Sequence, residues 1–298
     1  MINVTLKQMR YFEALSRHGH FGRAAAASAI SQPALSIQIK ELETDLGGTL
    51  FERGGRQVRL TPFGEEVAIR IRKILLDVEH LDEFARTARG ALTGRFRLGI
   101  IPTIAPYLLP KLVVRLAETY PAVDLHVRET LTPRLIEELL HGKLDTAIIA
   151  LPVGLAALEE LPLFEEHFVL VRPQTEAGVP PPPPSELQDM RLLLLEEGHC
   201  FRDQTLAFCN AAAATPSEGL DGSSLSTLVQ MVGAGLGVTM IPEMAVPIET
   251  RAAPVACTHF PDPQPGRTIG MIWRKKSPLS STVEHIGEVA RQAFQSQG

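Results

Sequence analysis

The sequence predicts an α/β protein in which an N-terminal winged helix-turn-helix is joined by one long linker helix to a larger α/β domain. Three helical patterns and a hairpin come first, an apolar repeat runs from about residue 62 to 90, and short apolar strands alternate with helices from about residue 94. A chain of 298 residues is long enough for this division. We expect the boundaries to fall at residues 1–61, 62–91 and 92–298.

Short helices are expected in the head at about residues 5–17, 21–28 and 32–46. In the third, apolar residues at spacings of four, three and four form one helix face: Leu35, Ile39, Leu42 and Leu46. Ser31 stands where an N-cap is needed, and Pro33 is tolerated in the first turn. Because only Ala29 and Ile30 separate the second pattern from the third, the two helices are expected to form a helix-turn-helix.

A small hairpin and the linker helix follow. Residues 50–53 and 56–60 flank Gly54 and Gly55, which is the layout of a wing with a basic rim. From about Pro62 to Gly90, apolar residues alternate spacings of four and three over three heptads, which is typical of a helix that pairs with a second copy. This repeat consists of Val67, Ile71, Ile74, Val78, Leu81, Ala85 and Ala88. A helix that packs on its own domain is the alternative.

The rest of the chain predicts an α/β body with largely parallel sheets, in which ligands bind at the carboxyl ends of strands. Expected strands cover residues 95–101, 124–129, 146–151, 168–171, 192–195 and 238–241. Helical patterns cover 106–119, 133–141, 203–213, 224–234 and 280–295. The five prolines at 180–184 predict a stiff, extended surface connection.

Charge is distributed unevenly along the chain. Residues 1–60 hold eight Lys and Arg against five Asp and Glu, whereas the remainder holds 21 against 29. A basic head on an acidic body suggests that only the head touches a polyanion. No run of 18 apolar residues and no signal-peptide layout is found, and three cysteines fit a reducing compartment, so we expect a cytoplasmic protein with no membrane partner.

Cys200 and Cys209 indicate a thiol switch. A cysteine at the start of a helix, preceded by His199 and followed by Arg202, has three neighbours that favour the thiolate. Cys209 can supply a resolving thiol. If the intervening residues are helical, the two Cα atoms lie about 13 Å apart, beyond the limit of about 7 Å for a disulfide. Bonding them must therefore unwind local structure.

Other interpretations of the cysteines remain open at this point. Free cysteines usually pack as small apolar side chains. A zinc site is disfavoured, because His199, Cys200 and Cys209 form an incomplete and widely spaced ligand set. Cys257 has no partner in sequence and is expected to be inert. No metal and no cofactor is predicted.

The head resembles that of the LysR-type transcriptional regulators. The matching segments are residues 20–25, 31–36, 41–43, 46–47 and 50–53. The resemblance implies a winged helix-turn-helix, a dimerising linker helix and a two-subdomain effector domain of the periplasmic-binding-protein type (type 2). Residues 101–103, 106–110, 198–204, 208–209 and 267–270 further resemble the subgroup of that family that senses hydrogen peroxide.

The resemblance also implies roles for individual residues. Cys200 would be the peroxidatic and Cys209 the resolving cysteine of a reversible disulfide. The peroxide pocket would be lined by Thr103, Thr132, His199, Asp203 and Arg267. The third helix would enter the major groove of double-stranded DNA, with Arg53 on a phosphate. The exposed side of that helix consists of Ser31, Gln32, Pro33, Ser36, Gln38 and Lys40.

We therefore expect an activator of oxidative-stress genes that works as a homodimer or homotetramer, with RNA polymerase as a further partner, and that is not an enzyme. Two alternatives are open. In the first, a LysR-type regulator binds a small metabolite in its cleft and the cysteines are incidental. A thiol peroxidase or cysteine hydrolase would use His199 and Cys200, but such an enzyme has no need of a basic winged head.

Overall fold

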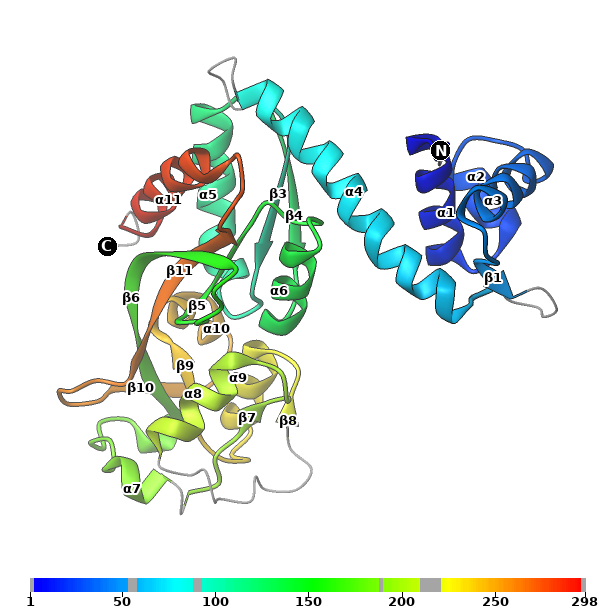
Figure 1. Ribbon diagram of the computed structural model, residues 1–298. Helices are drawn as coiled ribbons and strands as arrows, with labels where there is room; N and C mark the ends of the chain where they lie inside the picture. The colour runs from blue at the N-terminus through cyan, green and yellow to red at the C-terminus, as the bar shows by residue number, and fades with distance from the viewer. Residues whose placement is uncertain (1–2, 53–57, 88–92, 188–189, 210–220, 296–298) are drawn as a thin grey trace. The chain divides into compact units, whose positions relative to one another are not determined.

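The computed structural model describes residues 3–52, 58–87, 93–187, 190–209 and 221–295. The chain forms two compact units, residues 1–88 and 89–298. Figure 1 shows the elements of each unit along the chain. Neither unit contains, in the part that is described, a helix long and apolar enough to cross a membrane.

Three helices and a two-stranded hairpin form the head. They are α1 (Leu6–His18), α2 (Phe21–Ala27), α3 (Gln32–Leu46), β1 (Phe51–Glu52) and β2 (Arg59–Leu60), with β1 antiparallel to β2. The Ser31 hydroxyl accepts the N–H of Ala34, as expected of an N-cap. Phe12 and Phe51 meet in the core with ring centroids 5.2 Å apart. The predicted helix-turn-helix is confirmed, and the two strands of the hairpin pair as predicted, while its turn at Gly54 and Gly55 lies outside the described residues.

The wing is held directly against α3. The Glu43 carboxylate, on the last turns of α3, accepts the N–H of Leu50 at 2.9 Å and that of Phe51 at 3.4 Å. At Gly64, a Cβ atom would lie only 2.1 Å from the Leu50 carbonyl oxygen, so no larger residue fits there without a backbone shift. Helix α3, the hairpin and the start of α4 are thus packed together.

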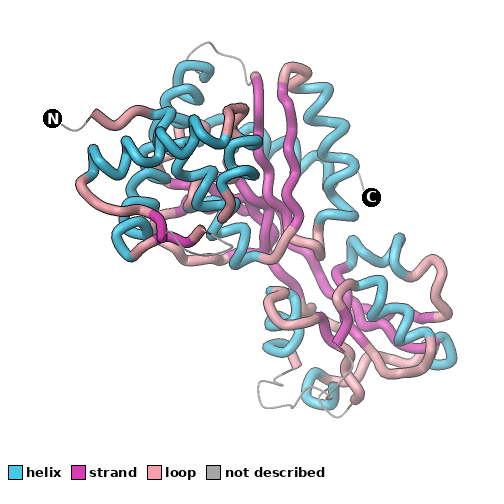
Figure 2. Tube along the Cα trace, turned by 90° about the vertical axis from the view of Figure 1, so that its right-hand side faces the viewer, coloured by secondary structure: helices cyan, strands magenta, loops and turns pink. Residues whose placement is uncertain are grey.

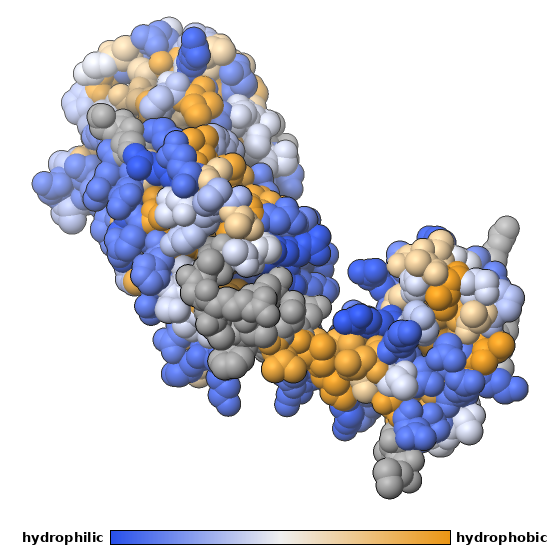
Figure 3. Space-filling model, turned by 90° about the horizontal axis from the view of Figure 1, so that it is seen from above, coloured by the Kyte–Doolittle hydropathy of each residue, from blue (hydrophilic) through white to orange (hydrophobic). Residues whose placement is uncertain are grey.

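The linker helix, α4 (Pro62–Thr87), is partly built into the head. Val67 and Ile71, together with Ala68 and Leu75, lie in the head core. The predicted inter-chain repeat is therefore wrong in its first two members, because they already pack within their own chain. Further along α4, Ile74 is 40% and Leu81 67% exposed. Figure 3 shows apolar surface gathered along the linker helix.

The second unit is built on a seven-stranded sheet in the order β10-β6-β11-β5-β3-β4, with β9 also paired to β6. Figure 2 shows its strands, in magenta, continuing from one half of this unit into the other. The elements before residue 190 are β3 (Gly94–Ile100), α5 (Ala105–Thr119), β4 (Val123–Glu129), α6 (Thr132–Leu140), β5 (Thr146–Leu151), β6 (Leu158–Pro173), η1 (Gln174–Glu176) and α7 (Pro184–Leu187).

The elements that follow are β7 (Leu194–Leu195), α8 (Cys200–Phe208), β8 (Asp221–Gly222), α9 (Leu225–Gly233), β9 (Thr239–Pro242), η2 (Glu243–Ala245), α10 (Val246–Glu249), β10 (Val255–His259), β11 (Gly266–Arg274) and α11 (Ser280–Gln295). Because β6 pairs with β11 over its first half and with β9 and β10 over its second, one strand runs through both halves of this unit.

The prediction of largely parallel sheets is wrong in this respect. Among the described strands, the β3–β4, β3–β5 and β7–β8 pairs are parallel, as is the isolated bridge between Leu192 and Val238, whereas β6, β9, β10 and β11 pair antiparallel. The α/β class itself holds. The proline run is also shorter as an extended connection than expected, because α7 begins at Pro184.

Candidate functional site

Cys200 is the first residue of α8, and Cys209 is the residue that ends it. All nine residues from Cys200 to Phe208 are helical. At a rise of about 1.5 Å per residue, the helix holds the two cysteine Cα atoms about 13 Å apart. Both thiols are free. The predicted helix start at Cys200 is confirmed, although the helix begins three residues earlier than the pattern at 203–213.

The three thiols have different environments. Cys200 is partly exposed, whereas Cys209 is fully buried. Burial raises the pKa of Cys209 to about 11, so at neutral pH this thiol is protonated while α8 is intact. Cys257, on β10, is partly exposed, and burial raises its pKa as well.

Two of the three neighbours expected to favour the Cys200 thiolate do not act in that way. Arg202 is buried and donates to the Leu195 carbonyl at 2.6 Å and to the Asp221 carboxylate at 3.1 Å, so its charge is already compensated. Burial lowers the pKa of His199, which disfavours its cationic form. The remaining feature is the N-terminus of α8, whose free N–H groups stabilise negative charge.

Arg267 lies at the centre of a buried polar cluster. Its Nε donates to the Glu166 carboxylate at 2.7 Å, and its Nη1 and Nη2 donate to the hydroxyl and the carbonyl of Thr103 at 2.9 and 3.2 Å. Both side chains of the ion pair are 1% exposed. Burial raises the pKa of Glu166, and the Arg267 guanidinium opposes that rise. The cluster joins the end of β3 to β6 and β11.

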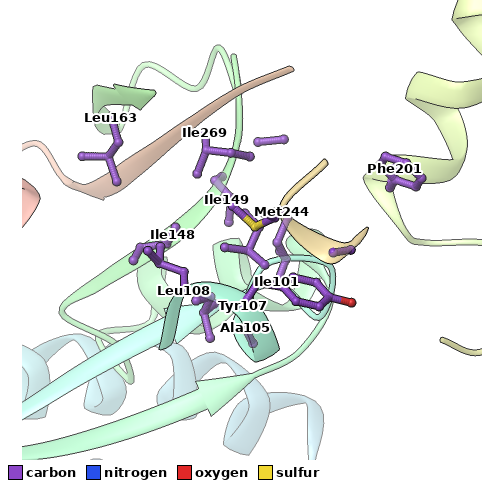
Figure 4. Packing of buried hydrophobic residues seen from close by; sticks show 14 of the residues in the cluster. Ile101, Ala105, Tyr107, Leu108, Ile148, Ile149, Leu163, Phe201, Met244 and Ile269 are labelled. Atoms are coloured by element: carbon purple, nitrogen blue, oxygen red, sulfur yellow. The ribbon is translucent and has the colours of Figure 1, made fainter. Parts of the chain in front are cut away.

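The same guanidinium contacts the helix that carries Cys200. Its central carbon lies 5.2 Å from the ring centroid of Phe201 and 5.9 Å from that of Phe168, within cation–π range. The two rings also meet edge to face, with centroids 4.8 Å apart. Figure 4 shows Phe201 projecting from α8, across from the buried side chains around Ile149 and Tyr107. Arg267 is thus one residue removed from Cys200.

The residue before α6, Leu131, lies close to the segment that precedes α8. Gly198 has a left-handed φ of 94°, and a Cβ atom there would lie 3.0 Å from Leu131. Thr132, the next residue after Leu131, opens α6, and its buried hydroxyl oxygen has no hydrogen-bond partner among the described residues. A buried hydroxyl without a partner is costly unless a ligand or water completes it.

The predicted pocket residues are therefore placed unequally. Thr103 and Arg267 bond each other, and Leu131, the residue before Thr132, lies close to Gly198, the residue before His199. Asp203 is exposed in the first turn of α8. Sequence reasoning missed Glu166, the buried partner of Arg267, and Gln204, whose buried Oε1 has no partner in the described part of the chain. The one available signal for Gln204 was its place four residues after Cys200, on the same face of the helix.

In the head, most of the residues expected at DNA lie on the open face of α3. Ser31, Gln32, Pro33, Ser36 and Lys40 are exposed. Gln38 is half-buried, and its amide donates to Glu41 at 2.7 Å. Arg53 lies outside the described residues. Ser31 is occupied as the N-cap, so its hydroxyl is shared with the Ala34 N–H.

The burial of the thiols predicts their order of alkylation. Iodoacetamide at pH 8 should modify Cys200 first in the native chain, with Cys209 last, because a buried thiol whose pKa is about 11 is ionised in roughly one molecule in a thousand at this pH. Peptide mass spectrometry over time measures each rate, and the urea-unfolded chain is the control in which the three rates converge. Equal native rates at Cys200 and Cys209 would contradict this placement.

Comparisons with known proteins agree with this architecture. Residues 6–65 match the family described as "Bacterial regulatory helix-turn-helix protein, lysR family", and residues 89–295 match the "LysR substrate binding domain". A probable hydrogen peroxide-inducible genes activator of Streptomyces viridosporus is 42% identical over 294 residues, covering 97% of this chain and 94% of the relative. The dual regulator OxyR of Escherichia coli K12 is 38% identical over 290 residues, covering 97% and 95%.

Solved structures extend the likeness to three dimensions. A full-length cysteine-to-aspartate variant of OxyR from Pseudomonas aeruginosa is 37% identical, with a TM-score of 0.77 and coverage of 97% of this chain and 95% of that one. A cysteine-to-serine mutant of OxyR from Corynebacterium glutamicum, with hydrogen peroxide bound, is 37% identical, with a TM-score of 0.68 and coverage of 98% and 93%. The chain therefore belongs to the LysR family of DNA-binding transcriptional regulators, within the OxyR group of hydrogen peroxide-inducible genes activators, and is a regulator rather than an enzyme.

Proposed function

We propose that this chain is a transcriptional activator of oxidative-stress genes, acting in the cytoplasm, in which hydrogen peroxide oxidises Cys200 and a Cys200–Cys209 disulfide changes how the protein acts on its operator. One observation carries the proposal most directly. A partly exposed thiol begins a helix, a buried thiol ends that helix, and the buried Arg267–Thr103 pair contacts the residue after the first thiol.

The chemistry balances in two steps. The Cys200 thiolate attacks one oxygen of the peroxide, the O–O bond breaks, and hydroxide leaves as a sulfenic acid forms on Cys200. The Cys209 sulfur then attacks the sulfenic sulfur, the S–O bond breaks, and the hydroxyl departs as water with the thiol proton. The peroxide is reduced and two thiols become one disulfide. Cellular dithiol reductants would reduce the disulfide back to two thiols.

Charge that develops on the leaving oxygen needs a donor. Thr103 accepts from Arg267, so its own O–H is oriented by that bond and is able to donate to a ligand. Thr132 offers a buried hydroxyl without a partner. We assign these two hydroxyls and Arg267 to positioning peroxide and stabilising the leaving hydroxide, as preorganised donors do in enzymes. His199, as a neutral ring, would accept or donate a single hydrogen bond.

Disulfide formation must dismantle α8. A separation of about 13 Å has to fall below about 7 Å, so the helix must unwind. Unwinding would disturb the Phe201–Arg267 contact, the Arg202–Asp221 ion pair, and the Phe208–Phe260 ring pair with centroids 5.1 Å apart. These contacts tie α8 to β7, β8, β11 and the end of β10, so the change would spread through this half of the unit.

Serine variants test the two thiol roles. Cys200→Ser should abolish the transcriptional response to peroxide, because the nucleophile is lost, and Cys209→Ser should stall at the sulfenic acid or over-oxidise. A reporter gene measures the transcriptional response. Mass spectrometry of the purified chain, before and after stoichiometric peroxide, measures the oxidation state of the thiols. Cys257→Ser is the matched control and should behave as wild type. If all three variants lose the response equally, or Cys209→Ser still forms an intramolecular disulfide, the assignment is wrong.

A second test addresses the pocket. Thr103→Val keeps the shape and removes the hydroxyl, so Cys200 oxidation should slow by at least about tenfold. Stopped-flow kinetics of the purified chain, free of enzymes that consume peroxide, gives the rate constant of Cys200 oxidation. Thr119→Val removes an exposed hydroxyl that bonds only the Arg115 carbonyl within its own helix, and should leave the rate unchanged. Equal rates in wild type and Thr103→Val would remove Thr103 from the pocket.

The DNA-binding form is proposed to be a homodimer, or a tetramer of two such dimers, paired through the exposed stripe of α4. Ile74 and Leu81 lie on this stripe, with the half-buried Val78 between them at spacings of four and three. Two linked heads bind one operator at high effective concentration. Ser31, Gln32, Pro33, Ser36, Gln38 and Lys40 would face the major groove, with Arg53 on phosphate, and RNA polymerase would be the partner in activation.

Introducing negative charge on this stripe tests the pairing of the two α4 helices. Ile74→Glu with Leu81→Glu should halve the oligomer mass and weaken operator binding by at least a hundredfold, while Cys200 still oxidises normally. Ile69→Glu is the control. Ile69 is as exposed as Leu81, at 67%, but lies about 140° around the helix from Ile74. Multi-angle light scattering gives the mass. A double variant that keeps its mass would show that this stripe is not the interface.

A further inference from the structure

Ile37 is an apolar side chain on the outer face of α3, the helix that is proposed to enter the major groove. It is 57% exposed. Within the described residues 3–52 and 58–61 of the head, the other exposed large apolar side chain is Leu6, at 43%, on the first turn of α1. The neighbours of Ile37 on α3 are polar or small, so its exposure is not the edge of a larger apolar patch.

The helix geometry places Ile37 opposite the core. Leu35 and Ile39 are buried, and each lies about 200° around the helix from Ile37 at 100° per residue; Leu42, also buried, lies about 140° away. The exposed residues Pro33 and Lys40 flank it, at four residues before and three after. Ile37 therefore occupies the middle of the face that is directed away from the head.

We propose that Ile37 reads a thymine, by packing against its 5-methyl group in the major groove. The inference rests on the proposed entry of α3 into that groove, and goes beyond it by naming a base and the residue that selects it. In the major groove, the thymine methyl is the one apolar group that a base edge presents, and apolar side chains are its usual partners. Lys40, on the same face, suits a nearby phosphate.

A partner protein would be the other occupant of an exposed isoleucine. The surroundings favour DNA, because Ser36 and Lys40 beside it are exposed and uncrowded polar groups rather than part of an apolar surface of the size that protein partners bury. Such a contact gains about the transfer free energy of one methyl group, which corresponds to a factor of about four in affinity per half-site.

The test removes the methyl group from the DNA. A duplex operator is first selected from random DNA with the purified full-length chain, and each thymine is then replaced in turn by deoxyuridine, which differs only in lacking the methyl. We expect one thymine in each half-site at which replacement weakens binding about fourfold, and about fifteenfold when both half-sites are replaced. Fluorescence anisotropy at fixed salt measures the affinities.

A protein variant closes the cycle. With Ile37→Ser the deoxyuridine effect at that thymine should vanish, whereas with Leu6→Ser, the matched exposed site on α1, it should persist. Circular dichroism melting confirms that both variants fold. The inference is overturned if no thymine shows the loss, if the loss survives in Ile37→Ser, or if Ile37→Ser changes the oligomer mass instead. Failure to select any DNA would overturn the proposed DNA reading itself, a separate result.

Discussion

The buried guanidinium of Arg267 is the contact on which the site of the α/β unit depends. Taking a cation out of water is expensive unless paired and hydrogen-bonded groups replace the solvent. Here Glu166 supplies the opposite charge, Thr103 supplies two oxygens, and two aromatic rings cover the remaining faces. Because these partners come from separate strands and a helix, satisfying one side chain fixes their mutual positions.

This arrangement couples chemistry to architecture. Thr103 follows β3, Glu166 lies in the long strand β6, and Phe201 is the second residue of α8. Arg267 thus connects the start of α8 to β6, the strand that continues through both halves of the unit. In the head, by contrast, Glu43 fixes the wing to α3, and the first turns of α4 lie in the same core. A signal that reaches the head must therefore move it as a body.

The parts that the sequence predicts well are those governed by local rules. The cap at Ser31, the helix face of Leu35, Ile39 and Leu42, and the helix start at Cys200 all follow from spacing and capping. The sequence pattern predicts only residues 168–171 of strand β6, whose earlier part contains Pro162, a residue that is unfavourable within a strand. The structure accommodates this proline at a register shift opposite Gly270, where a bulge removes the need for its missing donor.

Long-range pairing explains the remaining differences. Glu166 and Arg267 are 101 residues apart, and nothing local marks either as buried. Arg202 lies two residues after Cys200, so sequence alone suggests that it serves the thiol. The fold gives it Leu195 and Asp221 instead, 7 and 19 residues away. A charge near a thiol in sequence is thus a poor guide until its competing partners are known.

The anchoring of α8 has a consequence for the sensitivity of the switch. Arg202, Phe201 and Phe208 anchor α8 in the reduced form, and the proposed disulfide would require that helix to open, so these contacts would stabilise the reduced form alone. Every contribution to the reduced form makes the disulfide a stronger oxidant, by about 30 mV for each 1.4 kcal/mol. In the proposed switch, contacts that look purely structural would therefore set the peroxide level at which the signal switches on and how long it persists, and substitutions far from sulfur would change both.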